Sequence, residues 1–450
     1  MKTTPANLLA AAFLASLLPA AAARAASSWD GKADVPIIVE ADPDRTNALY
    51  HPGETVTFTV ALKHKDQSPA DGEVSWVLTD DGFKPPLQTG TAVMKDGKAT
   101  VTGKLDAPGF LHFEATYKQD KQSYTAIAAA GFDPLKIQPS LPPPADFDAF
   151  WAEKKKGLAA VPMNPKMEPV AVPPDRPNCE AFDVKLDCVG GAPVSGYYAR
   201  PTNAKPKSCA IRLSVPGAGV RSADLLSPVR FASGGGVISM EINAHGILNG
   251  QPGSYYAGLD TGELRDYRKR GNTSRDTIYF LGAHLRSLRA LEFLIAQPEW
   301  DGRTISVEGG SQGGGLALAV AALDPRVTFV VAINPAFCDH SAMNAGRSPG
   351  WPKLVTVDPQ GKPDPASLEA ARYFDSCNFA TRIKAEAFMW EGFLDTLCPP
   401  SGVYAAYNQL KGKKFIIDDP DHGHGLDGMK LWPKVAAIQK EHYAAMKAKP

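Results

Sequence analysis

The spacing of hydrophobic and polar positions divides the chain near residue 140 into two parts. Before that point, short segments alternate apolar and polar residues, as half-buried strands do: Val56–Leu62, Val74–Leu78 and Leu111–Tyr117. Turn dipeptides such as Pro52-Gly53 and Asp71-Gly72 separate these segments. The pattern predicts an all-β, immunoglobulin-like sandwich over residues 26–135, which could bind glycan or act as a packing unit or spacer.

A Pro-rich linker is predicted at residues 136–145, and Asp146 is expected to cap a helix with one apolar face. Apolar strands then alternate with helices. The expected strands are 210–215, 236–242, 304–308, 329–333, 387–390 and 414–417, and the expected helices include 279–296 and 316–323. Continuous apolar strands of this kind predict a mostly parallel sheet covered by helices on both faces. We therefore expect an α/β domain over residues 146–450.

Residues 1–25 have the pattern of a signal peptide. Lys2 supplies a positive start, Leu8–Leu18 is apolar, and small residues at 21–25 offer a cleavage site. The alternatives are a disordered Ala-rich tail or an uncleaved anchor. No later segment has the roughly 20 apolar residues that a spanning helix needs. We expect a periplasmic or secreted protein with no stable membrane span.

Charge and cysteine content narrow the function classes. Lys plus Arg equals Asp plus Glu at 48 each, with no basic block, so a nucleic-acid partner is not expected. An oxidising compartment permits disulfides among the cysteines, although their pairing cannot be deduced. No C-x-x-C pair occurs, which argues against zinc or thiol-redox chemistry. The six cysteines are Cys179, Cys188, Cys209, Cys338, Cys377 and Cys398.

The most informative stretch is Gly309-Gly310-Ser311-Gln312-Gly313, which follows an apolar strand and precedes an Ala/Leu-rich helix. This G-x-S-x-G pattern is typical of a nucleophile elbow, where a serine occupies a sharp strand-to-helix turn. A Gly/Ser-rich structural turn is the alternative. The expected fold is therefore that of an α/β-hydrolase, with Ser311 as the candidate nucleophile.

A serine nucleophile needs a base, and the base needs an acid to orient it. In α/β-hydrolases the acid and then the histidine follow the serine, each in a loop after a later strand. Asp395 follows the strand that ends near Trp390, and His424 follows strand 414–417. His422 lies two residues from His424 and is an alternative base.

Two main-chain N–H groups would form the oxyanion hole. One is expected from Gln312, directly after the nucleophile, and the other from the loop after strand 210–215, where Ala218 is our choice.

The chain resembles the acetyl xylan esterase/cephalosporin-C deacetylase family over roughly residues 140–450. The similar strings are Gly309-Gly310-Ser311-Gln312-Gly313-Gly314, Leu394-Asp395-Thr396-Leu397-Cys398-Pro399-Pro400 and Tyr404-Ala405-Ala406-Tyr407-Asn408. By matching positions, the resemblance implies Ser311 as nucleophile, Asp395 as acid, His424 as base and Ala218 in the oxyanion hole.

Three family motifs are changed here. An Arg-Gly-Gln motif has become His245-Gly246-Ile247, His-Glu has become His424-Gly425, and His-Gly-Tyr has become Pro216-Gly217-Ala218. His245 is thus a candidate for substrate binding or for a structural role. The resemblance implies a homo-oligomer, although the first two changes and the added β-sandwich argue against the family's ring-shaped hexamer.

The chain is therefore expected to be a secreted serine esterase that removes acetyl groups from xylan or another acetylated carbohydrate through an acetyl-enzyme on Ser311. Neither a metal nor an organic cofactor is expected. The alternatives are a peptidase of the prolyl oligopeptidase type and a glycan-binding protein with an inactive hydrolase domain.

Overall fold

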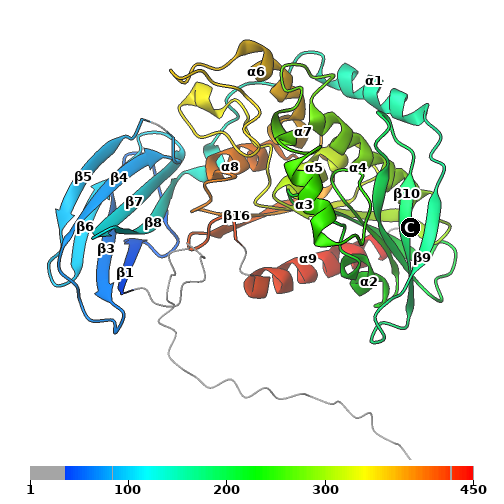
Figure 1. The fold of residues 1–450 in the computed structure, drawn as a ribbon, viewed down its shortest axis with the longest axis horizontal. Helices are drawn as coiled ribbons and strands as arrows, with labels where there is room; N and C mark the ends of the chain where they lie inside the picture. The colour runs from blue at the N-terminus through cyan, green and yellow to red at the C-terminus, as the bar shows by residue number, and fades with distance from the viewer. Residues whose placement is uncertain (1–35, 84, 426–427, 449–450) are drawn as a thin grey trace, which may run out of the picture.

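The computed structural model describes residues 36–83, 85–425 and 428–448. The predicted signal peptide and the start of the predicted sandwich, residues 26–35, lie outside the described residues. Figure 1 shows an N-terminal β unit beside a larger α/β unit. Among the helices of the described ranges, none is both long and apolar enough to cross a membrane.

The N-terminal unit consists of two β-sheets. One has the order β1-β3-β6 and the other β2-β8-β7-β4-β5; all pairs are antiparallel except β2 with β8. The rings of Phe58 and Phe113, one from each sheet, stack with centroids 4.9 Å apart in a shared core. The all-β prediction is confirmed for this unit, while the immunoglobulin-like assignment stays a prediction. The strands are β1 (Ile37–Pro43), β2 (Leu49–Tyr50), β3 (Val56–His64), β4 (Glu73–Asp80), β5 (Gln88–Val93), β6 (Lys98–Gly103), β7 (Gly109–Gln119) and β8 (Gln122–Phe132).

The larger unit is built on a nine-stranded sheet of order β17-β16-β15-β14-β12-β13-β11-β10-β9. The strands from β13 through β12 to β17 are parallel, and β9, β10 and β11 continue the sheet with antiparallel pairing. The strands are β9 (Lys166–Val170), β10 (Cys179–Leu186), β11 (Val194–Pro201), β12 (Cys209–Val215), β13 (Val237–Ile242), β14 (Trp300–Gly310), β15 (Phe329–Ile333), β16 (Glu386–Gly392) and β17 (Lys414–Asp419).

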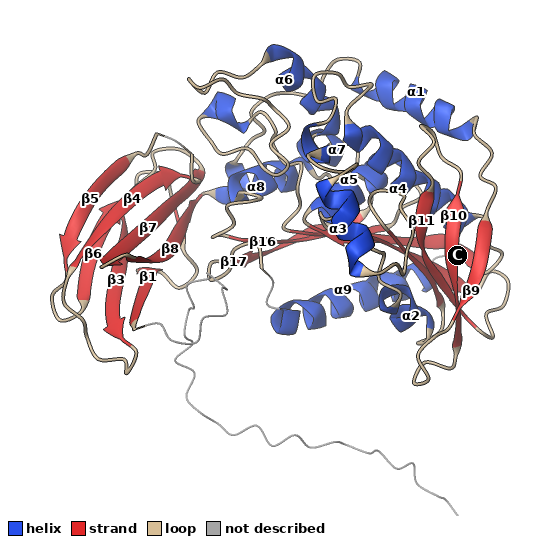
Figure 2. Ribbon diagram, viewed as in Figure 1, coloured by secondary structure: helices blue, strands red, loops and turns tan. Residues whose placement is uncertain are grey.

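Helices cover both faces of this sheet, with α4, α5 and α8 on one side and α2 and α9 on the other (Figure 2). This confirms the predicted α/β-hydrolase architecture, and each strand and helix expected from the hydrophobic pattern is present. The helices are α1 (Phe147–Ala159), α2 (Leu226–Ala232), α3 (Gly253–Thr261), α4 (Tyr279–Ile295), α5 (Gln312–Leu323), α6 (Pro365–Ala371), α7 (Ser376–Ala380), α8 (Pro400–Gln409) and α9 (Gly428–Ala448).

One sequence expectation, the helix cap at Asp146, needs correction. Asp146 stands at the start of α1, but its side chain makes no capping hydrogen bond. Instead its two carboxylate oxygens accept hydrogen bonds from Arg275 and from the Tyr373 hydroxyl, so tertiary partners occupy the atoms that would cap the helix. The six cysteines, all within the described residues, are free and buried, so none of the permitted disulfides is formed.

The sharpest local constraint in the fold is the crossing of β14 and α5. A Cβ on Gly313, at the start of α5, would lie 1.9 Å from the main-chain oxygen of Val215 in the neighbouring strand. A Cβ on Gly309 would lie 2.4 Å from the Gly313 carbonyl carbon. Only glycine allows the helix to approach the sheet this closely.

Replacing Gly313 with alanine is therefore expected to destabilise the protein by about 3 kcal/mol or more, the upper end of the usual cost of overpacking. With an unfolding entropy of about 2.1 cal/mol/K per residue, that corresponds to a fall in Tm of roughly 3 °C for a chain of 450 residues. Gly310→Ala is the matched control, because its Cβ would meet nothing closer than 3.7 Å. Thermal unfolding followed by circular dichroism checks both variants; an equal Tm for the two would contradict the steric explanation.

Candidate active site

Three loops meet at the carboxyl edge of the parallel strands. Ser311 directly follows β14, Asp395 follows β16, and His424 follows β17. Because β14, β15, β16 and β17 are mutually parallel, their carboxyl ends lie at one edge of the sheet. The fold therefore brings together three residues that are up to 113 positions apart in the chain.

Ser311 sits in a strained backbone conformation between β14 and α5. Its φ of 55° and ψ of −124° lie outside the regions that non-glycine residues prefer. The conformation is held by hydrogen bonds on both sides: its N–H donates to the Ile333 carbonyl at 2.8 Å, and its carbonyl accepts from the Ala336 N–H at 2.9 Å. The side chain is thereby presented at the turn, as the nucleophile-elbow pattern predicts.

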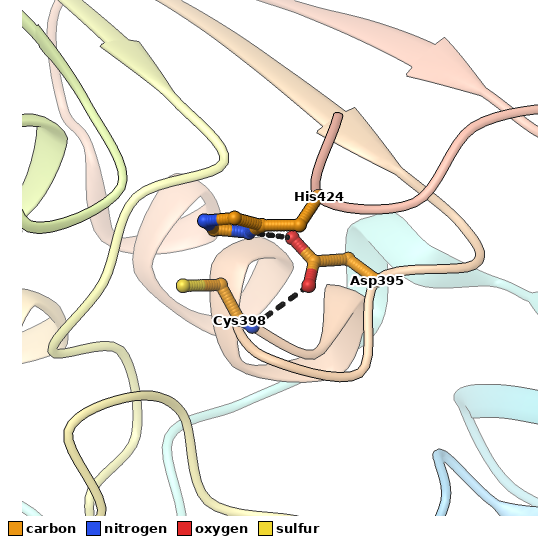
Figure 3. Close-up of side chains that lie close together, drawn as sticks. All are labelled: Asp395, Cys398 and His424. Atoms are coloured by element: carbon orange, nitrogen blue, oxygen red, sulfur yellow. Dashed lines mark hydrogen bonds and ion pairs between the residues drawn. The ribbon is translucent and has the colours of Figure 1, made fainter. Parts of the chain in front are cut away.

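A continuous line of hydrogen-bond contacts joins Asp395, His424 and Ser311. His424 Nε2 lies 2.9 Å from the Ser311 Oγ, and its Nδ1 lies 2.6 Å from Asp395 Oδ2. The second carboxylate oxygen of Asp395 accepts the main-chain N–H groups of Leu397 at 2.8 Å and Cys398 at 2.9 Å. Asp395 is fully buried, whereas the His424 side chain is about a quarter exposed. Figure 3 shows the Asp395 carboxylate between the imidazole and the Cys398 main chain.

His422, the alternative base, points to a different partner. Its Nδ1 lies 2.7 Å from Asp419 Oδ1, at the end of β17. Of the two histidines in this loop, it is therefore His424 that the structure places between Ser311 and Asp395.

The loops that carry Asp395 and His424 are tied to each other through their main chains. The Leu394 N–H donates to the His422 carbonyl at 3.0 Å, and the Asn334 amide donates to the carbonyls of Gly423 and His424, each at 3.2 Å. The Asn334 oxygen also accepts the Gly392 N–H at 3.3 Å. Asn334 directly follows β15, so its place at the carboxyl edge could have been predicted from the sequence, although it was not.

The expected oxyanion-hole residues lie beside the serine. Gln312 is the first residue of α5, where main-chain N–H groups have no partner within the helix. On the other side, a Cβ on Gly217 would lie 3.9 Å from the Ser311 Cβ, so the loop of residues 216–219 passes close to it. Arg221 donates to the carbonyls of Ala218 at 2.7 Å and Gly217 at 3.3 Å and so fixes the course of this loop.

His245 is buried next to the same loop. Its Nε2 lies 3.2 Å from the Gly219 carbonyl and its Nδ1 lies 2.6 Å from the Tyr279 hydroxyl. Burial lowers the pKa of this histidine to about 4, with the charge of Arg286 acting in the same direction, so the ring is neutral at pH 7. With both ring nitrogens engaged inside the protein, its contacts favour the structural role over direct substrate binding.

Within the described ranges, one group of potential metal ligands is closely spaced. Asp395, Cys398 and His424 each offer an atom within 4.8 Å of the others (Figure 3). Two of these atoms, Asp395 Oδ2 and His424 Nδ1, are bonded to each other, and burial raises the pKa of the Cys398 thiol well above its ordinary value. The hydrogen bond between Asp395 and His424 therefore explains why potential ligand atoms are closely spaced here.

Comparison with known proteins identifies related esterases. The family model for acetyl xylan esterase matches residues 133–430. The acetyl esterase Axe7A of Xylanibacter ruminicola is 28% identical over 407 residues, covering 89% of this chain and 89% of that protein. This match is too long to lie within the α/β unit alone, so it extends into the N-terminal β unit.

Among solved structures, an acetyl xylan esterase from Paenibacillus sp. R4 is similar with a TM-score of 0.59 and 27% identity, over 69% of this chain and 98% of that chain. Acetyl xylan esterase 1 from Thermoanaerobacterium sp. JW/SL YS485 has the same fold, with a TM-score of 0.57, 24% identity and the same coverage. With its family model matched through the strands and loops of the site, the chain belongs to the acetyl xylan esterase family of carboxylic ester hydrolases.

Proposed function

We propose that this enzyme removes acetyl groups from carbohydrate through an acetyl-enzyme on Ser311. The observation that carries the proposal is the line of contacts from Asp395 through His424 to the Ser311 Oγ, at 2.6 and 2.9 Å. His424 Nε2 takes the hydroxyl proton as Ser311 Oγ bonds to the ester carbonyl carbon, and Asp395 stabilises the imidazolium that results. His424 then gives that proton to the departing sugar oxygen.

The second half of the reaction returns the enzyme to its starting state. Water enters, His424 removes one of its protons, and the hydroxide that forms displaces Ser311 from the acetyl group. Acetate leaves and the proton returns to the Ser311 Oγ. Asp395 keeps the Nδ1 proton on His424 throughout, which leaves Nε2 free to act on the serine side.

The negative charge on the carbonyl oxygen is assigned to the N–H groups of Gln312 and Ala218. A trans peptide points its C=O and N–H in opposite directions. Because Arg221 holds the Gly217 carbonyl, the N–H of Ala218 in the same peptide faces away from Arg221. The start of α5 adds its positive helix end to the same position.

The proposed substrate class follows from the family, whose model is described as acetyl xylan esterase. Acetylated xylooligosaccharides are our proposed substrates, and Axe7A, named an acetyl esterase, supports acetyl over larger acyl groups.

The proposal predicts acetate release from acetylated xylooligosaccharides and from p-nitrophenyl acetate, and loss of both activities in Ser311→Ala. Removing a serine nucleophile typically lowers kcat by about 10⁴–10⁶-fold. Acetate is measured enzymatically and nitrophenol by absorbance. Release from the synthetic ester alone would retain the serine mechanism and reject the carbohydrate substrate; full activity of Ser311→Ala would reject the mechanism.

Alanine substitutions of the two histidines in the loop after β17 are expected to differ sharply in their effect on kcat. His424→Ala should lower kcat by about 10³-fold or more, because the serine loses its base. His422→Ala, the matched control two residues away, should stay within about tenfold of wild type, since its ring contacts Asp419 and not Ser311. Steady-state kinetics on p-nitrophenyl acetate check this pair. The assignment of the base is wrong should the His422 variant prove the more damaged.

Export across a membrane is also part of the proposed function, because a polymeric substrate lies outside the cell. Lys2 and the apolar segment Leu8–Leu18 support it. Six free thiols do not conflict with an oxidising compartment, since burial raises the pKa of each and keeps the reactive thiolate scarce. N-terminal sequencing of protein from the medium or periplasm should find a chain that starts after Ala23 or Ala25; an intact Met1 would contradict cleavage.

A further inference from the structure

The loop that carries Asp395 is supported from behind by the N-terminal β unit. This loop, residues 393–399 and here called the acid loop, joins the end of β16 to the start of α8. Phe110 of β7 packs against Phe393 of the acid loop, with ring centroids 4.9 Å apart, and against Tyr404 of α8 at 5.4 Å. Phe110 belongs to the hydrophobic core of the α/β unit and not to the core of the sandwich. The two units thus share a packed interior at this point.

Helix α8 cannot cap its own N-terminus. Its N-cap residue is Pro399, which offers no side-chain acceptor, and Pro400 at the first helical position has no N–H. The first N–H that needs a partner is that of Ser401. It donates to Asp81 Oδ2 at 3.1 Å, and the Ser401 hydroxyl bonds to the same oxygen. The cap of α8 therefore comes from the β unit, 320 residues away in sequence.

The backbone conformation and the burial of Asp81 favour this contact. It follows β4 in a left-handed conformation, with φ of 52°, and is 1% exposed. Such a backbone suits Asp, Asn and Gly and disfavours most other residues. Its other oxygen lies 3.3 Å from His112 Nε2, and the main chain of Phe393 interacts with the same imidazole and raises its pKa. Asp81 thus contacts α8 just after the acid loop, and His112 contacts the first residue of the loop.

Burial shifts the pKa values of three groups behind Asp395 toward their neutral forms. Burial raises the pKa of Asp81 to about 7, against the opposing effect of the Ser401 hydrogen bonds. Burial also raises the pKa of Glu391 well above its ordinary value and lowers that of His112 to about 4. Both hydrogen bonds from Ser401 end on one oxygen, Asp81 Oδ2, and an asparagine side chain also carries one oxygen acceptor.

We propose that Asp81 and His112 are positioning residues for the reaction, holding the acid loop so that Asp395 meets His424. The β unit is then part of the catalytic apparatus rather than an appended glycan-binding module. This inference rests on the proposed roles of Asp395, His424 and Ser311. It assigns the N-terminal unit a task that does not involve contact with the substrate.

The test uses the full chain and three variants. Asp81→Gly removes the cap without backbone strain, and Asp81→Asn keeps both the left-handed backbone and an acceptor oxygen. Asp96→Gly is the matched control, because Asp96 has the same φ of 52° in an exposed turn between β5 and β6. Kinetics on p-nitrophenyl acetate, expressed per folded molecule from thermal melts and size exclusion, separate chemistry from stability.

Asp81→Gly is expected to lower kcat by about tenfold or more with KM within about threefold of wild type, because a small displacement of a catalytic group is costly. Asp81→Asn and Asp96→Gly should remain within about threefold of wild type in both constants. The inference is overturned by a normal kcat per folded molecule in Asp81→Gly, by a change confined to KM, or by an Asn variant as impaired as the Gly variant.

If Asp81→Gly does not fold, His112→Leu replaces it, since this change removes the polar ring that faces Asp81 and the main chain of Phe393 and leaves an apolar group in the interior. The same loss in kcat is expected, and a normal kcat again overturns the inference. Ser311→Ala, assayed alongside, separates the two levels: activity in that variant rejects the proposed function, whereas its inactivity together with a normal Asp81→Gly rejects only the role of the β unit.

Discussion

The strained strand-to-helix turn at Ser311 is the constraint on which the rest of the structure depends. It requires glycine at Gly309 and Gly313, since a Cβ at either position would overlap the main chain of α5 or β12. In return, the turn places the serine hydroxyl at the carboxyl edge of the sheet and the start of α5 directly behind it. The positions useful for a base and an acid are then limited to the loops that follow later parallel strands.

Contacts with neighbouring elements of the fold hold those loops in place. Asn334 ties the Asp395 and His424 loops together from the end of β15. Asp81 caps the helix that follows the acid loop. The N-terminal β unit, which lies outside the matched family region, thereby contacts the site from behind. The Axe7A relative spans this unit as well, which is the arrangement expected if the two units act together.

Much of the fold could be predicted because the burial of each strand determines the pattern of apolar residues along it. Strands covered on both faces are continuous apolar runs, as at Phe329–Ile333, and sandwich strands alternate, as in β3. The order of Ser311, Asp395 and His424 follows from topology. The helix-cap prediction failed because it depends on partners distant in sequence. Aspartate is a suitable residue for a helix cap, yet Asp146 binds Arg275 and Tyr373 instead. No local pattern reveals that Asp81 contacts Ser401, or which of His422 and His424 faces the serine.

The most direct measurement of the central claim is a rapid acid quench of the enzyme with an acetylated xylooligosaccharide, followed by mass mapping of its peptides. An acetyl group on the peptide that contains Ser311, formed during the first turnover and absent from Ser311→Ala, is the result expected. An acetyl group on another side chain would contradict the claim. So would a burst of released sugar with no acetylated peptide.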